Sequence, residues 1–230
     1  MTTSIDTTAT SFGPKAGYHH GDLREALLTA ADQLLHEEGL GGLTLRACAR
    51  RAGVSHAAPK HHFADLAELL SEVAARSFDR LTEALNQARP AAGDGPEQHF
   101  IMVARTYVMF ARRHPDHFRL MFRSDVLDRC NAALSSASAR TFAEMAGCVT
   151  GLRGEAEVSS HDLRERIRDE SLMEDILIGW SHVHGYAQLL LEGQLAVFAR
   201  EENLDDFLQR TLAATGRRLS RLLSADGSCG

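Results

Sequence analysis

The sequence of 230 residues lacks any apolar run that approaches the roughly 18 residues of a membrane-spanning helix. Its first residues, Met1 to Gly17, are rich in Thr and Ser and lack the charged start and apolar stretch of a secretory signal. We therefore expect a cytoplasmic protein without a membrane contact, in which residues 1–17 form a flexible arm.

Cysteine is also scarce. The four cysteines form no Cys-x-x-Cys pair and are scattered at Cys48, Cys130, Cys148 and Cys229. Reduced cytoplasmic thiols are the plain interpretation. Two alternatives stay open: a thiol redox switch, and a metal sensor in which folding gathers His114, His117 or the cysteines. The spacing along the chain by itself predicts no metal site and no cofactor.

The motifs of the common enzyme classes are missing as well. The sequence contains no GxSxG, HExxH or phosphate-binding glycine loop. Its twelve histidines do not compensate. His182 and His184 are two residues apart on an expected helix and point to different faces, and the adjacent His61 and His62 diverge in the same way. The sequence predicts that the protein is not an enzyme.

Only five prolines interrupt a chain rich in Ala, Leu and Arg, which favours helices. No segment alternates apolar and polar residues as a strand does, so we expect an all-α fold of about nine helices. In the first half, helices are expected over residues 22–38 and 45–52, from Ser55 onward, and from a capping box at Asp65 and Glu68 to residue 89. In the second half, they are expected over residues 97–113, 115–122, 128–149, 162–198 and 203–223.

The most informative stretch runs from Leu43 to Phe63 and contains no acidic residue. Its basic residues are Arg46, Arg50, Arg51 and Lys60. The whole chain has a formal net charge of −6, so the chain outside this stretch sums to −10. Inside the stretch, a Gly53-Val54-Ser55 turn separates two short helical patterns. A basic helix-turn-helix pattern in an acidic chain predicts binding to duplex DNA.

This stretch resembles the TetR family of one-component bacterial repressors. The residues that carry the resemblance are Leu43-Thr44-Leu45-Arg46, Ala49, Ala52-Gly53-Val54-Ser55, His62-Phe63 and Leu69-Leu70. The lead-in over residues 18–23 also resembles one subgroup of the family. Farther on, residues 180–185 (Trp-Ser-His-Val-His-Gly) resemble the Trp-His-Gly signature in the C-terminal domain of that subgroup, and residues 107–122 resemble the same domain. The resemblance implies an N-terminal three-helix helix-turn-helix DNA-binding domain over 18–65. It also implies a C-terminal helical domain over 66–225 that dimerises and binds an effector.

The chain departs from the family pattern at two places. The family usually has Leu-Tyr where this chain has Pro59-Lys60, and Lys where it has Leu66. The tyrosine that the family usually has at position 60 contacts a DNA phosphate. Lys60 would make this contact with a full charge, which predicts a stronger salt dependence of DNA binding. Pro59 loses one backbone hydrogen bond and crowds the carbonyl of Ser55, so the third helix is expected to be short or bent.

We expect the third helix to enter the major groove with Ser55 as its N-cap, His56 on a purine edge and Ala57 on a thymine methyl group. The predicted DNA-binding residues are Thr44, Arg46, Ser55, His56, Ala57, Lys60, His61 and His62. Lys15, His19 and His20 of the arm can add phosphate contacts. An ordinary solvated face is the alternative for any single one of these side chains.

Aromatic and Met side chains, which make adaptable apolar cavities, gather in the second half of the chain. The predicted ligand-binding residues are Met102, Tyr107, Phe110, Phe118, Met121, Phe122, Trp180 and His184, with Met109 in the same stretch. A plain core is the alternative for each of them. Because few charges fall among them, the expected small-molecule effector is apolar or aromatic with one polar end.

The last two long helices carry more apolar residues than one stripe needs. Packing them against their symmetry mates would make a four-helix dimer interface, although an intramolecular core can also absorb them. The sequence thus predicts a homodimeric regulator, most simply a repressor, that binds a palindromic double-stranded DNA operator and is released by a small ligand. The alternatives are a metal- or thiol-responsive regulator of the same fold, and a helical adaptor that has lost DNA binding, which Pro59 and Leu66 favour.

Overall fold

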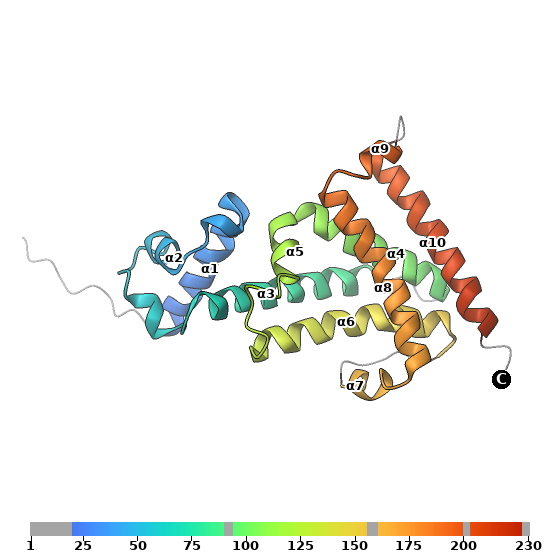
Figure 1. The fold of residues 1–230 in the computed structure, drawn as a ribbon, viewed down its shortest axis with the longest axis horizontal. Coiled ribbons are helices and arrows are strands. Elements are labelled where there is room, and N and C mark those ends of the chain that lie inside the picture. The colour runs from blue at the N-terminus through green and yellow to red at the C-terminus, as the bar shows by residue number, and fades with distance from the viewer. Residues whose placement is uncertain (1–19, 90–93, 156–160, 200–202, 227–230) are drawn as a thin grey trace, which may run out of the picture.

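The computed structural model describes residues 20–89, 94–155, 161–199 and 203–226 (Figure 1). Within these ranges it contains ten α-helices, two short 3-10 helices and no strand, which confirms the predicted all-α fold. None of the helices in this part of the chain is both long and apolar enough to cross a membrane. The arm predicted over residues 1–17 lies outside the described residues.

The first helices form a small unit, residues 20–65, that we call the head. It contains α1 (His20–Glu38), η1 (Leu40–Gly42), α2 (Leu45–Arg51) and η2 (Ala58–His61). Gly39 ends α1 with a φ of 69°, a left-handed conformation that favours glycine. Leu34, Leu43, Cys48 and Phe63 are buried in the centre of the head, so the short helices are held by one shared core.

Helix α3 (Leu66–Gln87) runs from the head into the remainder of the chain, residues 66–226, which we call the body (Figure 1). The predicted capping box is present at its start. The side chain of Asp65 accepts a hydrogen bond from the amide of Glu68 at 2.9 Å. The carboxylate of Glu68 accepts one from the amide of Ala64 at 2.7 Å. This cap fixes the point at which the chain leaves the head.

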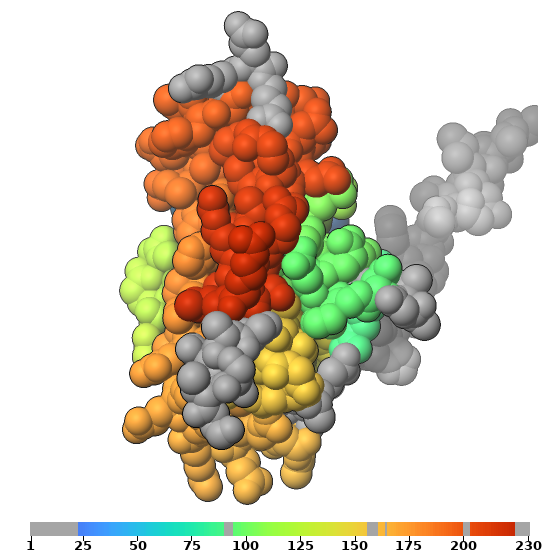
Figure 2. Space-filling view, turned by 90° about the vertical axis from the view of Figure 1, so that its right-hand side faces the viewer, coloured from blue at the N-terminus to red at the C-terminus, as the bar shows by residue number. Residues whose placement is uncertain are grey.

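The body contains α4 (Pro96–Arg113), α5 (Pro115–Met121), α6 (Ala132–Leu152), α7 (Leu163–Arg166), α8 (Glu170–Leu191), α9 (Ala196–Ala199) and α10 (Leu204–Asp226). Helix α3 packs along α6, and α4 packs against both α8 and α10. Figure 2 shows α10 lying across one side of the body beside α8.

The prediction of one long helix over residues 162–198 is wrong, because the chain there forms α7, α8 and α9. Asp169 caps α8 by accepting a hydrogen bond from the amide of Leu172 at 3.1 Å. Gly193 ends the helix with a φ of 73°. A helix start signal and a glycine stop signal therefore lie inside a stretch whose apolar spacing is continuous.

Asp32 of α1 connects the head to the body. Its two carboxylate oxygens accept hydrogen bonds from Arg80 of α3 at 2.8 and 2.9 Å. One of these oxygens also lies 3.1 Å from Nε2 of His117 in α5, whose side chain is only 5% exposed. Burial alone would raise the pKa of Asp32, but the hydrogen bonds from His117 and Arg80 outweigh it and hold this pKa well below its usual range. The charged carboxylate is therefore part of the head–body contact.

Candidate DNA-binding surface and ligand cavity

Helix α2 and the turn after it have the geometry expected of a helix-turn-helix unit. Thr44 caps α2, since its hydroxyl accepts a hydrogen bond from the amide of Ala47 at 3.0 Å. After α2, Gly53 takes a φ of 69° and lets the chain reverse. The amide of Val54 then donates to the carbonyl of Ala49 at 3.0 Å. Thr44 thus keeps its predicted capping role, and its side chain lies at the exposed start of α2.

The third element of the head differs from the prediction. It is the single 3-10 helix η2, which begins after Ala57 and has no side-chain cap, so the predicted role of Ser55 as a helix N-cap is wrong. Pro59 cannot donate a backbone hydrogen bond and disfavours α geometry at Ala58. The chain instead makes 3-10 turns: Ala58 donates to the carbonyl of Ser55 at 3.0 Å, and Lys60 donates to that of Ala57 at 3.3 Å.

The predicted DNA-binding side chains lie together on and around α2 and η2. Those that are exposed are Thr44, Arg46, Ser55, His56, Ala57, Lys60 and His61, whereas His62 is half-buried. Pro59 and Phe63 are buried beneath them. Leu66, where the family usually has Lys, packs against the core. The sequence therefore identified an exposed surface built on a fixed apolar base.

The charges of this surface are not equivalent. Arg51 is paired with Glu37 of α1 at 2.6 Å. Arg46, Arg50 and Lys60 have no acidic partner among the described residues. The basic surface thus keeps three uncompensated cations of the four in residues 43–63. Guanidinium and ammonium groups of this kind bind phosphates. Arg50 is exposed on this surface, although it belongs only to the basic stretch and not to the predicted DNA-binding residues.

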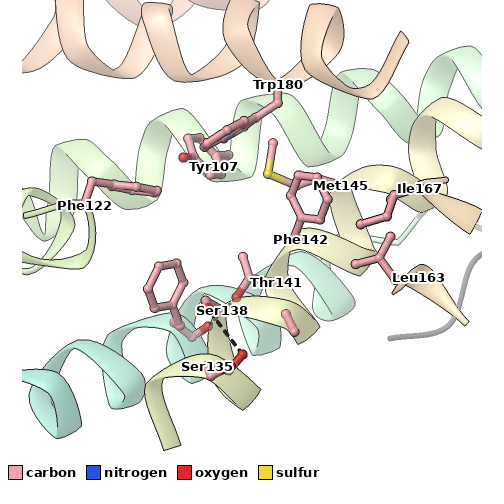
Figure 3. Close-up of a pocket in the computed structure, with 12 residues that line it drawn as sticks. Tyr107, Phe122, Ser135, Ser138, Thr141, Phe142, Met145, Leu163, Ile167 and Trp180 are labelled. Atoms are coloured by element: carbon pink, nitrogen blue, oxygen red, sulfur yellow. Dashed lines mark hydrogen bonds between the residues drawn. The ribbon is translucent and has the colours of Figure 1, made fainter. Parts of the chain in front are cut away.

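A cavity of about 530 Å³ lies in the body, between α3, α4, α6, α7 and α8. Of the predicted ligand-binding residues, Tyr107, Phe122 and Trp180 line it. Figure 3 shows Tyr107 and Trp180 on one side of the cavity and Ser135, Ser138 and Thr141 on the other. No charged side chain of the described residues lines the cavity.

Sequence reasoning missed the wall that α6 contributes. This wall carries Ser135, Ser138, Ala139, Thr141, Phe142 and Met145, and the lining is completed by Phe78 of α3 and by Leu163 and Ile167 at α7. Small residues at helical spacing come first on this face of α6 and two large residues follow, and that pattern is the signal that could have found the wall. Small side chains leave the space, while Phe142 and Met145 border it.

The other predicted ligand-binding residues lie elsewhere. Phe118 and Met121 are buried, and they and His184 do not line the cavity. The ring of His184 packs against Phe118 at 5.6 Å and Phe122 at 4.6 Å between centroids, behind the cavity wall. Met102, Met109 and Phe110 line a second hollow between α3 and α4. Of the eight predicted residues, three thus line the cavity, two line the second hollow and three line neither.

Two polar contacts of His184 support the wall of the cavity. The hydroxyl of Tyr107 lies 2.9 Å from Nδ1 of His184. The side-chain amide of Gln188 lies 3.2 Å from Nε2 of the same ring. Burial lowers the pKa of His184 and raises that of Tyr107. Both groups are therefore neutral near pH 7, and the cavity is apolar with a hydrogen-bonding group at its edge.

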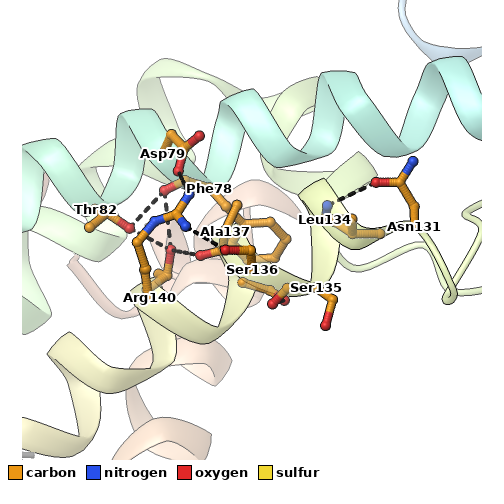
Figure 4. A network of polar contacts seen from close by, with 11 residues as sticks. Phe78, Asp79, Thr82, Asn131, Leu134, Ser135, Ser136, Ala137 and Arg140 are labelled. Carbon is orange, nitrogen blue, oxygen red and sulfur yellow. Dashed lines mark hydrogen bonds and ion pairs between the residues drawn. The ribbon is translucent and has the colours of Figure 1, made fainter. Parts of the chain in front are cut away.

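Polar contacts also fix α6 to α3 (Figure 4). The hydroxyls of Thr82 and Thr141 lie 2.7 Å apart, and Thr141 donates to the carbonyl of Phe78 at 3.1 Å. Arg140 of α6 pairs with Asp79 of α3 at 2.5 Å. Since Phe78 and Thr141 both line the cavity, these bonds connect its wall directly to the backbone of α3.

No group of three or more His, Cys, Asp or Glu side chains within the described ranges is arranged to hold a metal ion. His114 and His117 lie near each other, with ring centroids 6.2 Å apart. Cys48 and Cys148 are buried, Cys130 is exposed, and Cys229 lies outside the described residues. Burial raises the pKa of Cys48 to about 11, so its thiol is not activated.

Family models match both parts of the chain. Residues 27–73 match the model for bacterial regulatory proteins of the tetR family, and residues 100–215, half of the chain, match the model for the tetracyclin repressor-like C-terminal domain. The chain belongs to the TetR family. No curated protein matches it. As a TetR protein with a helix-turn-helix head, it is a DNA-binding transcriptional regulator.

Solved structures share this fold. The chain is similar to a protein with unknown function from Rhodococcus sp. RHA1, with a TM-score of 0.69 and 28% identity over 91% of this chain and 100% of the other. It is also similar to the TetR family transcriptional regulator PfmR from Thermus thermophilus (TM-score 0.53, 16% identity, 85% and 97% covered). A third is SCO7222, a TetR from Streptomyces coelicolor (TM-score 0.51, 21% identity, 88% and 97% covered). The last two identities show the fold alone.

Proposed function

We propose that this TetR protein is a cytoplasmic repressor of the Trp-His-Gly subgroup. A homodimer binds a palindromic operator, and a neutral, largely apolar ligand in the body cavity releases it. The observation that carries this proposal is the course of α3. This helix begins at the capped Asp65 beside the basic surface, and it supplies Phe78 to the cavity wall. One rigid element therefore connects the two sites.

The proposed release mechanism follows from this connection. A ligand that displaces α6 has to move α3 as well, because Thr141 and Arg140 bind the two helices together. The head moves with the start of α3, and the spacing of the two heads in a dimer then no longer matches two half-sites. The size of the response is limited to the difference in the ligand's affinity for the two arrangements.

The proposed DNA contacts use the uncompensated cations. Arg46 and Lys60 approach phosphates or guanine edges, and His56 and Ala57 face the bases. Ser55, Thr44, His61 and His62 complete the surface. Because η2 is a single turn, its side chains reach the groove from a tight turn and not from a long recognition helix.

The proposed dimer uses the exposed side of α8 and α10, which lie next to each other in Figure 2. On α8, Ile178 is 37% and Leu189 43% exposed, and on α10, Leu222 is 50% exposed. Between Ile178 and Leu189, the small residues Ser181 and Gly185 allow another helix to approach closely. An apolar helix face of this kind is typical of a subunit interface.

The charge and polarity of the proposed effector follow from the residues that line the cavity. Its walls are aromatic and aliphatic and carry no charge, so a charged ligand would lose its hydration without a partner. Tyr107 on one wall, and Ser135 and Ser138 on the other, can each form a hydrogen bond with a ligand. A neutral aromatic or aliphatic compound with one polar end fits these walls.

Selection of bound duplexes from a random pool tests the DNA-binding part. We expect an enriched, two-fold-symmetric sequence at moderate salt, and recovery of no such sequence would contradict the proposal.

Sedimentation of the free protein tests the dimer. Leu189→Asp should give monomers, whereas Ala133→Asp, on the exposed start of α6, should leave the dimer intact.

The effector part is tested through Trp180, which lines the cavity and is the only tryptophan. Neutral aromatic and aliphatic compounds are screened for a change in its fluorescence, and each hit is tested for release of the selected duplex. Ala139→Phe, which fills the cavity, should abolish both responses and preserve operator binding. Compounds that still release the Ala139→Phe variant from the selected duplex would show that the cavity is not the effector site.

A further inference from the structure

The second hollow of the body, which we call the α3–α4 groove, has a volume of about 450 Å³ and shares no lining residue with the cavity. It lies between one stripe on α3 and one on α4. On α3, Arg80, Ala84 and Ala88 follow one another at four-residue spacing. The two alanines leave the space that a larger pair of side chains would fill.

The floor of the groove is apolar and adaptable. It consists of Met102, Met109 and the buried Phe110 of α4 together with the two alanines of α3. Methionine side chains have three rotatable bonds and a polarizable sulfur, so they adjust to apolar ligands of different shapes. The volume falls in the range of small-molecule sites, roughly 300 to 1,000 Å³.

The rim of the groove is positively charged. Arg105 and Arg113 of α4 are exposed and have no acidic partner among the described residues. Arg80 borders the groove from α3, and no carboxylate of the described residues lines it. The pKa of the half-buried His114, also at the rim, is lowered first by burial and then by neighbouring positive charges that include Arg80 and Arg113. The groove therefore has a positive potential in a chain of formal charge −6.

We propose that the α3–α4 groove binds an amphipathic organic anion. Its carboxylate or phosphate head pairs with Arg105 and Arg113, and its apolar body lies on Met102 and Met109. Guanidinium groups form charge-assisted hydrogen bonds with such heads, and the apolar floor adds burial that a small inorganic anion cannot obtain. This ligand differs in charge from the neutral compound proposed for the cavity.

The groove also borders the contact between head and body. Arg80 lines it and at the same time holds Asp32 of α1 through two hydrogen bonds. An anion in the groove competes with Asp32 for this guanidinium and weakens the attachment of the head. This consequence rests on the proposed function, whereas binding of the anion does not.

The experiment measures binding to the full-length protein without DNA, so its outcome is independent of the proposed function. Sodium dodecanoate below its micelle concentration is the probe, 1-dodecanol is the neutral control, and affinity is measured by calorimetry. The test variant is Arg105→Gln with Arg113→Gln. The matched control is Arg129→Gln with Arg168→Gln, which removes two exposed arginines outside the groove. Ala139→Phe reports on the body cavity.

We expect dodecanoate to bind the wild type, with a loss of roughly tenfold or more in the Arg105/Arg113 variant. The control variant and Ala139→Phe should bind it as the wild type does, and 1-dodecanol should bind more weakly. Failure of dodecanoate to bind would overturn the proposal. Equal affinity in the Arg105/Arg113 variant, or loss of binding in Ala139→Phe, would overturn it as well.

Discussion

The hydroxyl of Tyr107 lies 2.9 Å from Nδ1 of His184, and the amide of Gln188 lies 3.2 Å from Nε2. With the Gln188 amide assigned as the donor to Nε2, the neutral ring carries its proton on Nδ1 and donates it to Tyr107. In this arrangement His184 does not accept a hydrogen bond from the hydroxyl of Tyr107. The hydroxyl proton is available to an acceptor in the cavity that Tyr107 lines.

Tyr107→Phe removes this donor while it keeps the ring, which packs edge-on against Phe118 with centroids 5.3 Å apart. We expect the free energy of unfolding to fall by about 1 kcal/mol, the usual contribution of one hydrogen bond. We also expect compounds that carry a polar acceptor to lose affinity for the cavity. Urea unfolding and Trp180 fluorescence measure the two effects. The control is Tyr186→Phe, the same change at a residue that does not line the cavity.

Burial lowers the pKa of His184 below its ordinary value of about 6.5. At a pH between the lowered pKa of His184 in the folded chain and its ordinary pKa in the unfolded chain, the unfolded chain binds more protons than the folded one. The stability from the neutral ring is therefore present above about pH 6.5 and is lost as the pH falls. The fall in unfolding free energy from pH 7 to pH 5.5 should be smaller in His184→Asn by up to about 1 kcal/mol. His182→Asn, on the exposed side of the same helix, is the control. An unchanged pH dependence in His184→Asn would contradict the assignment.

Local signals in the sequence predicted the features that depend on a few neighbouring residues. The capping box at Asp65 and Glu68 and the cap at Thr44 need contacts only within one turn, so their residue types sufficed. The prediction of a third helix capped by Ser55 failed for a local reason too. Pro59 removes a backbone donor and restricts Ala58, so the chain forms η2 without a cap at Ser55.

Features that depend on distant residues were not predictable in the same way. The pairing of Arg51 with Glu37 joins two helices and removes one cation from the basic surface. Of the aromatic residues predicted to bind a ligand, Tyr107, Phe122 and Trp180 line the cavity, whereas Phe118 packs behind it. Helical spacing places all four on apolar faces, and only the packing of α6 against α3 decides which of them borders a space.

The difference between Arg46 and Arg51 gives a direct test of the basic surface. Arg46→Ala should weaken binding to the selected duplex and reduce the slope of log affinity against log salt by about 1, the expectation for one lost phosphate contact. Arg51→Ala removes the same charge, but Arg51 is already neutralised by Glu37, so the slope should change little. Equal slopes for both variants in a titration at several salt concentrations would contradict this division.

Pro59→Leu tests the cause of the 3-10 geometry. The substitution restores a backbone donor and relaxes the restriction on Ala58, so residues 56–62 should become α-helical. Carbon chemical shifts of these residues measure the change, and Ala57→Leu, which leaves the proline in place, is the control. If residues 56–62 keep their shifts in Pro59→Leu, the packing of Phe63 and its neighbours sets the conformation, and the proline does not.

Asp32→Asn tests the contact between head and body. The carboxylate accepts hydrogen bonds from Arg80 and His117, and these outweigh its burial and depress its pKa. A depressed carboxyl pKa means that the stability it contributes is fully present above the unfolded value of about 3.9 and is lost only below it. At pH 7 the substitution should therefore cost about 2 kcal/mol of unfolding free energy, the loss of hydrogen bonds to a charged group. Asp79→Asn, which removes an ion pair with Arg140 at the surface, should cost less than about 1 kcal/mol.

Hydrogen exchange gives a second test of the same contact. The amide hydrogens of α1 should exchange faster in Asp32→Asn than in Asp79→Asn, because α1 separates from α3 and α5 without unfolding of the body. Equal exchange in the two variants would mean that apolar packing, and not Asp32, holds the head in place.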